Sequence, residues 1–328
     1  MMRQIATPLT VIACIGTCLC TAHAAVNVDW VTIGDAGNAA DNLGNGSVAY
    51  TYRIGKYEVT TSQYTAFLNA IANDDPYGLY NPDMEVGEVA CGILRSGTPG
   101  NYTYSVVAGR ENKPVNYVSF WDACRFTNWM HNDQGAGDTE TGAYTLTPEA
   151  IMNNTVTRNV DAQVFVTSHD EWVKAAYYKG GGLDAGYRNY ANMYTAGFYS
   201  WPFADTPPGS TTSNGSANWA GSMWAGTADL TDVGAYVWTH SAYGTYDQTG
   251  NVAEWNEAIA EPAKRGIRDG SWASPMCKGE PTHIGRTAEG YGDPMSESSV
   301  LGFRIATIPE PGTLVLFALS AWALRRRR

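Results

Sequence analysis

The chain has 328 residues and a mass of 35.4 kDa, which allows one large domain or two small ones. Hydrophobic residues make up 44% and charged residues 16%, so the chain can bury a sizeable core and lacks the composition of a charge-rich disordered protein. A formal net charge of −11 excludes the basic surface that nucleic-acid binding requires, so we expect no nucleic-acid partner.

Residues 1–24 have the three parts of a secretory signal. Arg3 supplies the positive start, residues 9–20 form an apolar run of 12, and an Ala-His-Ala sequence ends at Ala24 as a small-x-small cleavage site. Twelve residues fall well below the ~20 that a membrane span needs, which disfavours a permanent N-terminal anchor. We expect signal peptidase to cleave after Ala24 and leave Ala25 as the first residue.

The first predicted elements of the body are a strand and a helix. Residues 48–54 alternate in the way that indicates a strand with one buried face, and residues 57–59 extend again after a turn. Thr60 and Gln63 form a capping-box pair at the start of a helix. Apolar residues then recur with the helical period up to Ile71.

Two further helices are predicted in the middle of the chain. The first begins near Ser119, has Asp122 in its first turn, and runs to about His131 with one apolar stripe facing inward. The second begins at Ser168, with Glu171 as its capping partner.

The rest of the body is predicted to be irregular. After Lys179, about 55 residues have loop composition, and a loop of that length inside a compact domain needs a metal or a dense polar network to hold it. Residues 265–306 indicate short strands around turns. Because no repeat or low-complexity linker divides these parts, we expect residues 25–308 to form one α+β domain with little regular secondary structure.

Removal of the leader changes the cysteine count. Three of the six cysteines lie in the leader, and three remain: Cys91, Cys124 and Cys277. An odd number in an exported chain allows at most one internal disulfide and leaves one thiol over, with the pairing open. The sequence contains no Cys-x-x-Cys, which argues against a structural zinc site. Lipidation at Cys18 is a weaker alternative to signal-peptidase cleavage, because the preceding residues match a lipidation box poorly.

The C-terminus carries a second sorting segment, residues 309–328. Pro309, Glu310 and Pro311 precede an apolar run at residues 313–324, which four arginines follow. This order resembles the PEP-CTERM sorting signal. The resemblance implies export, transient membrane retention through the apolar helix, processing by an exosortase-type enzyme, and localisation to the cell envelope or extracellular surface.

The apolar run in this tail is short. Twelve residues make ~18 Å of helix against a hydrocarbon core of ~30 Å, so a span must thin the bilayer or include flanking residues. A buried terminal helix is the alternative, which the arginines disfavour. Because the leader carries one excess positive charge and the tail three, the body has a formal charge of −15.

Six segments of the body occur in a characteristic order. They are residues 57–60, 114–123, 168–172, 246–255, 268–272 and 301–304. Together they resemble the sulfatase-modifying-factor, or formylglycine-generating enzyme-like, family over roughly residues 30–306. The resemblance implies a single domain of C-type-lectin-like topology that binds structural calcium.

The same resemblance implies two sets of calcium-binding residues. The first set is Asn218, Trp219, Asp232 and Gly234, and the second is Asp247, Gly250, Val252 and Glu254. Each set offers one or two side-chain oxygens on a Gly-containing loop, and calcium would need carbonyls and waters besides. Ordinary turns, in which Asp or Asn bonds its own backbone, are the alternative.

The family's best-known activity is copper-dependent oxidation of a sulfatase cysteine to formylglycine, and this sequence departs from its pattern. The two copper cysteines of the family fall on Ser274 and near Gly279, and only Cys277 is close. Paired thiolates suit Cu(I), so copper is not expected unless Cys91 or Cys124 joins Cys277. The tryptophan of the Gly-Asn-x-Trp-Glu-Trp motif is also replaced, here by Ala253.

Other chemistry in the same cleft has weak support. Ser271, Ser274 and Cys277 are the candidate cleft residues, and a serine with His283 lacks the nucleophile-elbow motif that would support a triad. The four histidines of the body show no metal-ligand spacing. Three functions remain open: a surface module that binds a glycan, peptide or matrix ligand, a formylglycine-generating oxidase, or an enzyme with different chemistry.

Overall fold

The computed structural model describes most of the body of the chain. The described residues are 25–86, 90–191, 216–219, 229–260, 263–274 and 284–309, together with the backbone of 203–204. Several predicted positions lie outside them: the leader to Ala24, Cys277, Gly279, His283, Glu310 and Pro311.

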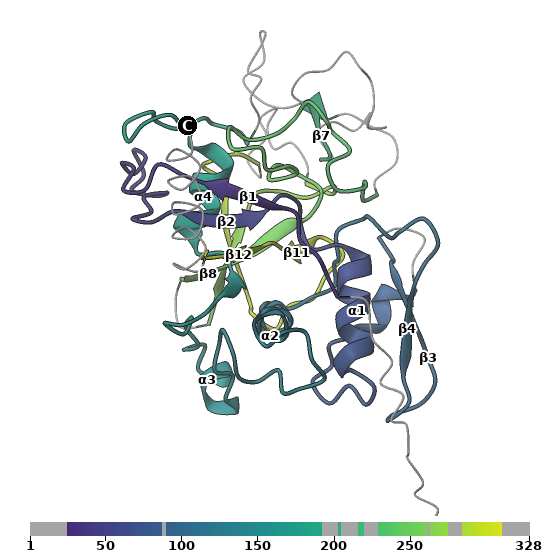
Figure 1. The fold of residues 1–328 in the computed structure, drawn as a ribbon. Coiled ribbons are helices and arrows are strands. Elements are labelled where there is room, and N and C mark those ends of the chain that lie inside the picture. Colours follow the sequence, from purple (N-terminus) through teal and green to yellow (C-terminus); the bar gives the residue numbers. More distant parts are fainter. Residues whose placement is uncertain are drawn as a thin grey trace, which may run out of the picture.

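Two four-stranded sheets form the centre of the fold (Figure 1). The first has the order β1-β2-β12-β5, with every neighbouring pair antiparallel. The second has the order β10-β9-β8-β11, in which β11 runs parallel to β8. The strands of the first sheet are Trp30–Ile33, Tyr52–Gly55, Ile305–Thr307 and Val164–Val166, in sheet order. Those of the second are Glu289–Gly292, Arg265–Arg268, Ala253–Ile259 and Leu301–Phe303.

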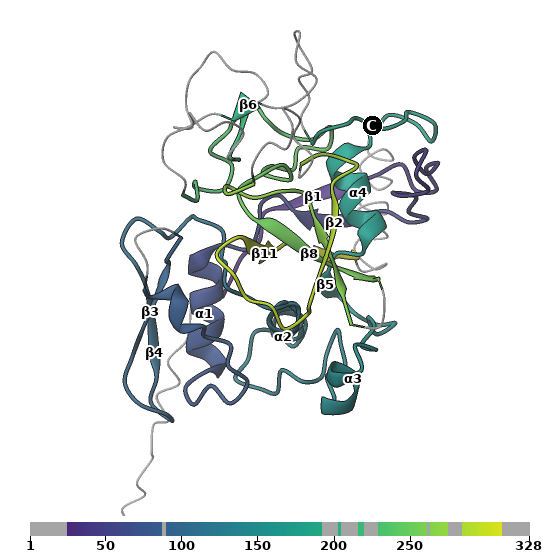
Figure 2. The ribbon, with the colours of Figure 1, turned by 180° about the vertical axis from the view of Figure 1, so that it is seen from behind.

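Two smaller strand pairs lie outside these sheets. β3 (Ile93–Ser96) and β4 (Thr103–Val106) form an antiparallel hairpin, and β6 (Phe203–Ala204) pairs in parallel with β7 (Ser216–Ala217). Seen from both sides in Figures 1 and 2, α1 lies between the hairpin and the strands β1 and β2. The short strands at 265–307 confirm the expected strand-rich C-terminal part.

All three predicted helices are present and begin as expected. They are α1 (Thr61–Ile71), α2 (Phe120–His131) and α4 (His169–Tyr177), and each starts with a complete capping box. Two short helices were not predicted: α3 (Pro148–Met152) and the 3₁₀ helix η1 (Pro82–Met84).

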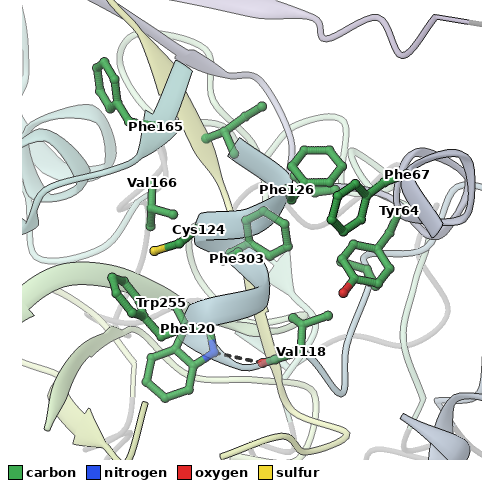
Figure 3. Close-up of a cluster of buried hydrophobic side chains, with 14 of the residues drawn as sticks. Tyr64, Phe67, Val118, Phe120, Cys124, Phe126, Phe165, Val166, Trp255 and Phe303 are labelled. Carbon is green, nitrogen blue, oxygen red and sulfur yellow. Dashed lines mark hydrogen bonds between the residues drawn. The ribbon is translucent and has the colours of Figure 1, made fainter. Parts of the chain in front are cut away.

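Helix α2 is the centre of the hydrophobic core (Figure 3). Phe126 contacts the rings of Phe67 and Phe303, and Trp255 donates a hydrogen bond of 3.0 Å to the carbonyl of Val118 just before the helix. Every residue from Phe120 to Trp129 is buried. The predicted inward stripe is confirmed, since Ala123 and Phe126 are buried in the core and Met130 packs against it. The other faces of this stretch are buried as well, because other elements cover α2 on all sides.

The predicted strand at residues 48–54 is also partly wrong. The chain bends at Ala49 and Tyr50, and β2 starts only at Tyr52. Tyr50 therefore stays outside the sheet and is 40% exposed, and its hydroxyl donates to Glu171 at 2.7 Å. The expected extension at residues 57–59 forms no strand. Among the described residues, no helix is long and apolar enough to cross a membrane.

Candidate functional site

The turn after β9 brings two of the candidate cleft residues together. The Ser271 amide donates to Ser274 Oγ at 2.8 Å, and the Ser274 amide donates to the Ser271 carbonyl at 2.9 Å. Their hydroxyl oxygens lie 3.4 Å apart. Within the described part of the chain, no histidine hydrogen-bonds either hydroxyl, so this part supplies no histidine base for a serine nucleophile.

The Asp269 side chain holds this turn in place through hydrogen bonds. Its buried carboxylate accepts hydrogen bonds from the amides of Gly270 and Gly285 and from the hydroxyls of Tyr177 and Thr249. Burial raises the pKa of Asp269 to about 6, against the lowering effect of those bonds. Asp269 therefore connects the turn to α4 and to the segment that begins at residue 284. Asp269 was not among the predicted site residues, although its Asp-Gly pair is a turn signal that could have identified it.

The two described cysteines differ in their access to this turn. Cys124 is fully buried in the α2 core (Figure 3), where burial raises the pKa of its thiol. Cys91 is half-buried and follows Ala90, which packs in one cluster with Trp272 of the turn. Of these two cysteines, only Cys91 adjoins a residue that packs against the Ser271 turn.

The two predicted calcium sets lie together in the fold. Asp247 Oδ2 of the second set accepts a hydrogen bond of 2.5 Å from the Gly234 amide of the first. The backbone of Gly250 lies directly against that of Asn218, and the Asn251 amide donates a hydrogen bond to the Asn218 carbonyl at 2.8 Å. Residues predicted as two separate groups therefore form one continuous cluster.

Several members of these sets already have other partners. Glu254 Oε2 accepts from Trp172 Nε1 at 2.7 Å, and its Oε1 accepts from Arg304 at 2.9 Å. Asp232 is 57% exposed and lies 3.6 Å from Lys113 Nζ. Trp219 and Val252, both buried, have only carbonyls to offer. The Glu254 carboxylate therefore does not fit as a free cation ligand.

Glu58, which the sequence did not single out, is the unexplained group of this cluster. Both its carboxylate oxygens are buried with no hydrogen-bond donor among the described residues, and one lies 3.9 Å from Arg304. Burial, and then the neighbouring Asp247, raise the pKa of Glu58 well above its usual value. Burial also raises the pKa of Asp247 to about 6.

Three buried carboxylates thus share one guanidinium. Glu58, Asp247 and Glu254 surround Arg304, so with all three ionised the cluster would carry two excess negative charges, which a divalent cation would neutralise. The described side chains contain no group of three His, Cys, Asp or Glu with metal-site geometry. A cation here would therefore need backbone carbonyls and water in addition to Glu58 and Asp247, which is a donor set that suits calcium.

A cavity of about 420 Å³ opens beside this cluster. Tyr57 lines it, and Gly234 lets the Tyr57 ring approach closely, since a Cβ there would lie 2.4 Å from Cε1. Four of its polar lining residues are Asn27, Asp29, Asn112 and Asp232. None of these four makes a side-chain hydrogen bond within the described part of the chain, although Asp232 is paired with Lys113, so their polar atoms can still bind a ligand.

The sequence profile of the sulfatase-modifying factor enzyme 1-like domain matches residues 34–308. The chain belongs to the sulfatase-modifying factor family. The profile of the PEP-CTERM protein-sorting motif matches residues 307–328, which confirms the tail. That motif implies export, cell-envelope sorting and exosortase-type processing.

Solved structures similar to this family member agree on the fold. The crystal structure of CarF has a TM-score of 0.55 and 21% identity, over 87% of this chain and 99% of CarF. Treponema denticola variable protein 1 has a TM-score of 0.52 and 19% identity, over 88% of this chain and 97% of its own. The expected α+β, C-type-lectin-like single domain is thereby confirmed. No curated protein matches the chain at a significant level.

Proposed function

We propose that this family member is an envelope-sorted, calcium-stabilised ligand-binding module that lacks the two-cysteine copper oxidase chemistry. The sorting motif supports its destination, the Ser271 turn supports the loss of oxidase chemistry, and the cavity beside Tyr57 supports ligand binding. The transient membrane tether through the C-terminal apolar run, and removal of the leader by signal peptidase, are part of the same proposal.

The observation that carries the loss of oxidase chemistry is the placement of the cysteines. Ser274 stands at the first copper-cysteine position, and its hydroxyl oxygen accepts a hydrogen bond from the Ser271 amide. Two-coordinate Cu(I) needs a second thiolate, and Cys124 cannot provide it from inside the α2 core. Cys277 would therefore depend on Cys91 alone.

Calcium is proposed as a structural ion at the cluster that contains Glu58 and Asp247. The two unpaired oxygens of Glu58 support it, because a buried carboxylate without a donor is strongly disfavoured unless a cation or proton compensates it. Carbonyls of the 218–219 and 247–252 segments would complete the coordination. When bound, the ion would hold together loops that have little regular structure.

The cavity beside Tyr57 is proposed to bind a small neutral, hydroxyl-rich ligand such as a saccharide. Each of its three carboxylates has a cation nearby, Lys56 for Asp29, Lys113 for Asp232 and Arg304 for Glu58, so the lining favours no net charge. Carboxamides and carboxylates around an aromatic ring suit hydroxyl groups and a sugar face.

The oxidase question is tested with the purified domain, Cu(I) and a peptide that contains the sulfatase-type Cys-x-Pro-x-Arg sequence. We expect no stoichiometric copper binding and no aldehyde product. Stoichiometric copper with turnover would establish the alternative function, an oxidase that pairs Cys277 with Cys91, and Cys91→Ser would then abolish both signals.

The ligand proposal is tested by saturation-transfer NMR with cellobiose, maltose and N,N′-diacetylchitobiose. We expect transfer to at least one disaccharide, lost in Asn112→Ala and kept in Asn132→Ala, whose side chain lies outside the cavity. Equal spectra for the two variants would exclude this cavity as the binding site.

A further inference from the structure

Both ends of the domain line one surface hollow of about 500 Å³, here called the terminal hollow. Val26 and Trp30 line it from the start of the domain, and Ile308 and Pro309 line it from the end. Two glutamines complete its walls, Gln134 just after α2 and Gln163 just before β5. The two chain ends that carry sorting signals therefore leave the domain at the same face.

The N-terminal end is fixed at this face by two hydrogen bonds. The Val26 amide donates to Gln134 Oε1 at 2.6 Å, and Gln134 Nε2 donates back to the Val26 carbonyl at 2.9 Å. Val26 is almost fully buried and is the second residue after the predicted cleavage point. A leader still attached would thus begin at the edge of the terminal hollow.

The C-terminal end is held by strand β12. β12 ends at Thr307 inside the first sheet, and the apolar run of the tail starts at Thr313. Four residue steps separate Pro309 from Thr313, and an extended chain spans at most about 3.6 Å a step, or about 14 Å in all. A bilayer that holds the apolar run must therefore lie within that distance of Pro309.

The charge of the terminal hollow fits such a neighbour. Arg53 is its one charged residue, and none of the described residues that line it is acidic, although the body carries −15. Trp30 and Met130 add apolar surface. Tryptophan and arginine are the side chains that favour the headgroup region, whereas the acidic remainder of the surface is repelled by anionic lipid.

We propose that the terminal hollow is the face that this protein lays against the phospholipid surface while its tail is held in the membrane. The proposal rests on the tether in the proposed function and adds to it a defined orientation. Because both chain ends leave the domain at this face, the orientation applies from the closure of the first sheet until the tail is cut.

The test uses the full chain bound to vesicles of phosphatidylcholine and phosphatidylglycerol, with a benzophenone amino acid at one position at a time. Gln163 is the reporter, since it is exposed in the terminal hollow yet far in sequence from both ends. Leu94 is the matched control, because it is also exposed and belongs to β3, which lies across α1 from β1 and β2 (Figures 1 and 2). Resistance to carbonate extraction reports on tail insertion independently.

We expect at least fivefold more lipid cross-linked at Gln163 than at Leu94. We also expect Arg53→Glu to reduce the Gln163 yield on vesicles with phosphatidylglycerol and not on phosphatidylcholine alone. Equal yields at Gln163 and Leu94 in carbonate-resistant protein would overturn the orientation and leave the tether intact. Release of the protein by carbonate would instead overturn the tether, and the orientation with it.

Discussion

Replacing Gly250 by alanine should strongly destabilise the protein, because an alanine methyl group would not fit where Gly250 joins the two predicted calcium sets. Its φ of +90° is in a region that side chains rarely adopt. A Cβ built there would lie 2.3 Å from the carbonyl oxygen of Asn218 and 2.8 Å from its carbonyl carbon. Both are backbone atoms, so no rotamer change can relieve the contact.

The size of the effect follows from these two terms. A non-glycine residue held at such a φ costs about 1–3 kcal/mol. Forcing a methyl group into packed backbone costs about 1–3 kcal/mol more. Gly244 is a matched control, since its φ is +92° and no described atom lies within 4 Å of the methyl carbon that an alanine would add. Gly244→Ala should therefore show the first term alone.

Urea unfolding of both variants at equal pH, in EDTA and in calcium, measures the difference. We expect Gly250→Ala to lose about 1–3 kcal/mol more than Gly244→Ala in the free energy of unfolding. We also expect it to lose the calcium response, because Asn218 must move. Equal destabilisation of the two variants would refute the close approach of Gly250 to Asn218.

Three further predictions follow from buried charges. Burial raises the pKa of Asp122 to about 7, so the folded state holds a proton that the unfolded chain releases, and the free energy of unfolding falls as pH rises from about 4 to 7. Asp122→Asn should remove up to about 4 kcal/mol of that fall. Urea midpoints that change with pH in the same way in the variant and the parent protein would contradict this. Arg158→Met leaves the Glu171 and Glu257 carboxylates buried without their guanidinium and should lower the free energy of unfolding by about 3–5 kcal/mol. Arg53 is exposed, so Arg53→Met should change it by less than about 0.5 kcal/mol. Similar losses in the two variants would show that the buried ion pairs do not determine stability. Removal of calcium with EDTA should lower the Tm, and Glu58→Gln should shrink that shift; an unchanged Tm, with no metal by elemental analysis, would eliminate the calcium proposal.

Local signals in the sequence predicted the helices well. The capping pairs at Thr60, Ser119 and Ser168 act within four residues, so their geometry is encoded where they stand. α3 was missed because five residues show no period, although Thr147 followed by proline was a usable start signal. The strand predicted at 48–54 was too long, because alternation cannot reveal the bend at Tyr50, whose hydroxyl donates to Glu171 outside the sheet.

The candidate site depended on long-range contacts that no local pattern encodes. The family motifs placed Asp247 and Glu254 in one loop, but only the fold shows Arg304 inserted between Glu254 and Glu58. The Glu58 carboxylate was overlooked for the same reason, since its neighbours come from segments about 190 residues or more further along the chain. The calcium assignments themselves stay predictions.

The position of β12 in the first sheet has a consequence for how this chain crosses a membrane. β12 lies between β2 and β5, so the sheet cannot close until Thr307 has left the translocation channel. Until then β5 lacks its only neighbour in the sheet and β2 lacks one of its two. The apolar run starts at Thr313, six residues after the last strand ends. On the proposed tether, arrest of the tail and closure of the sheet would therefore nearly coincide, and the membrane that stops the chain would also give it time to fold.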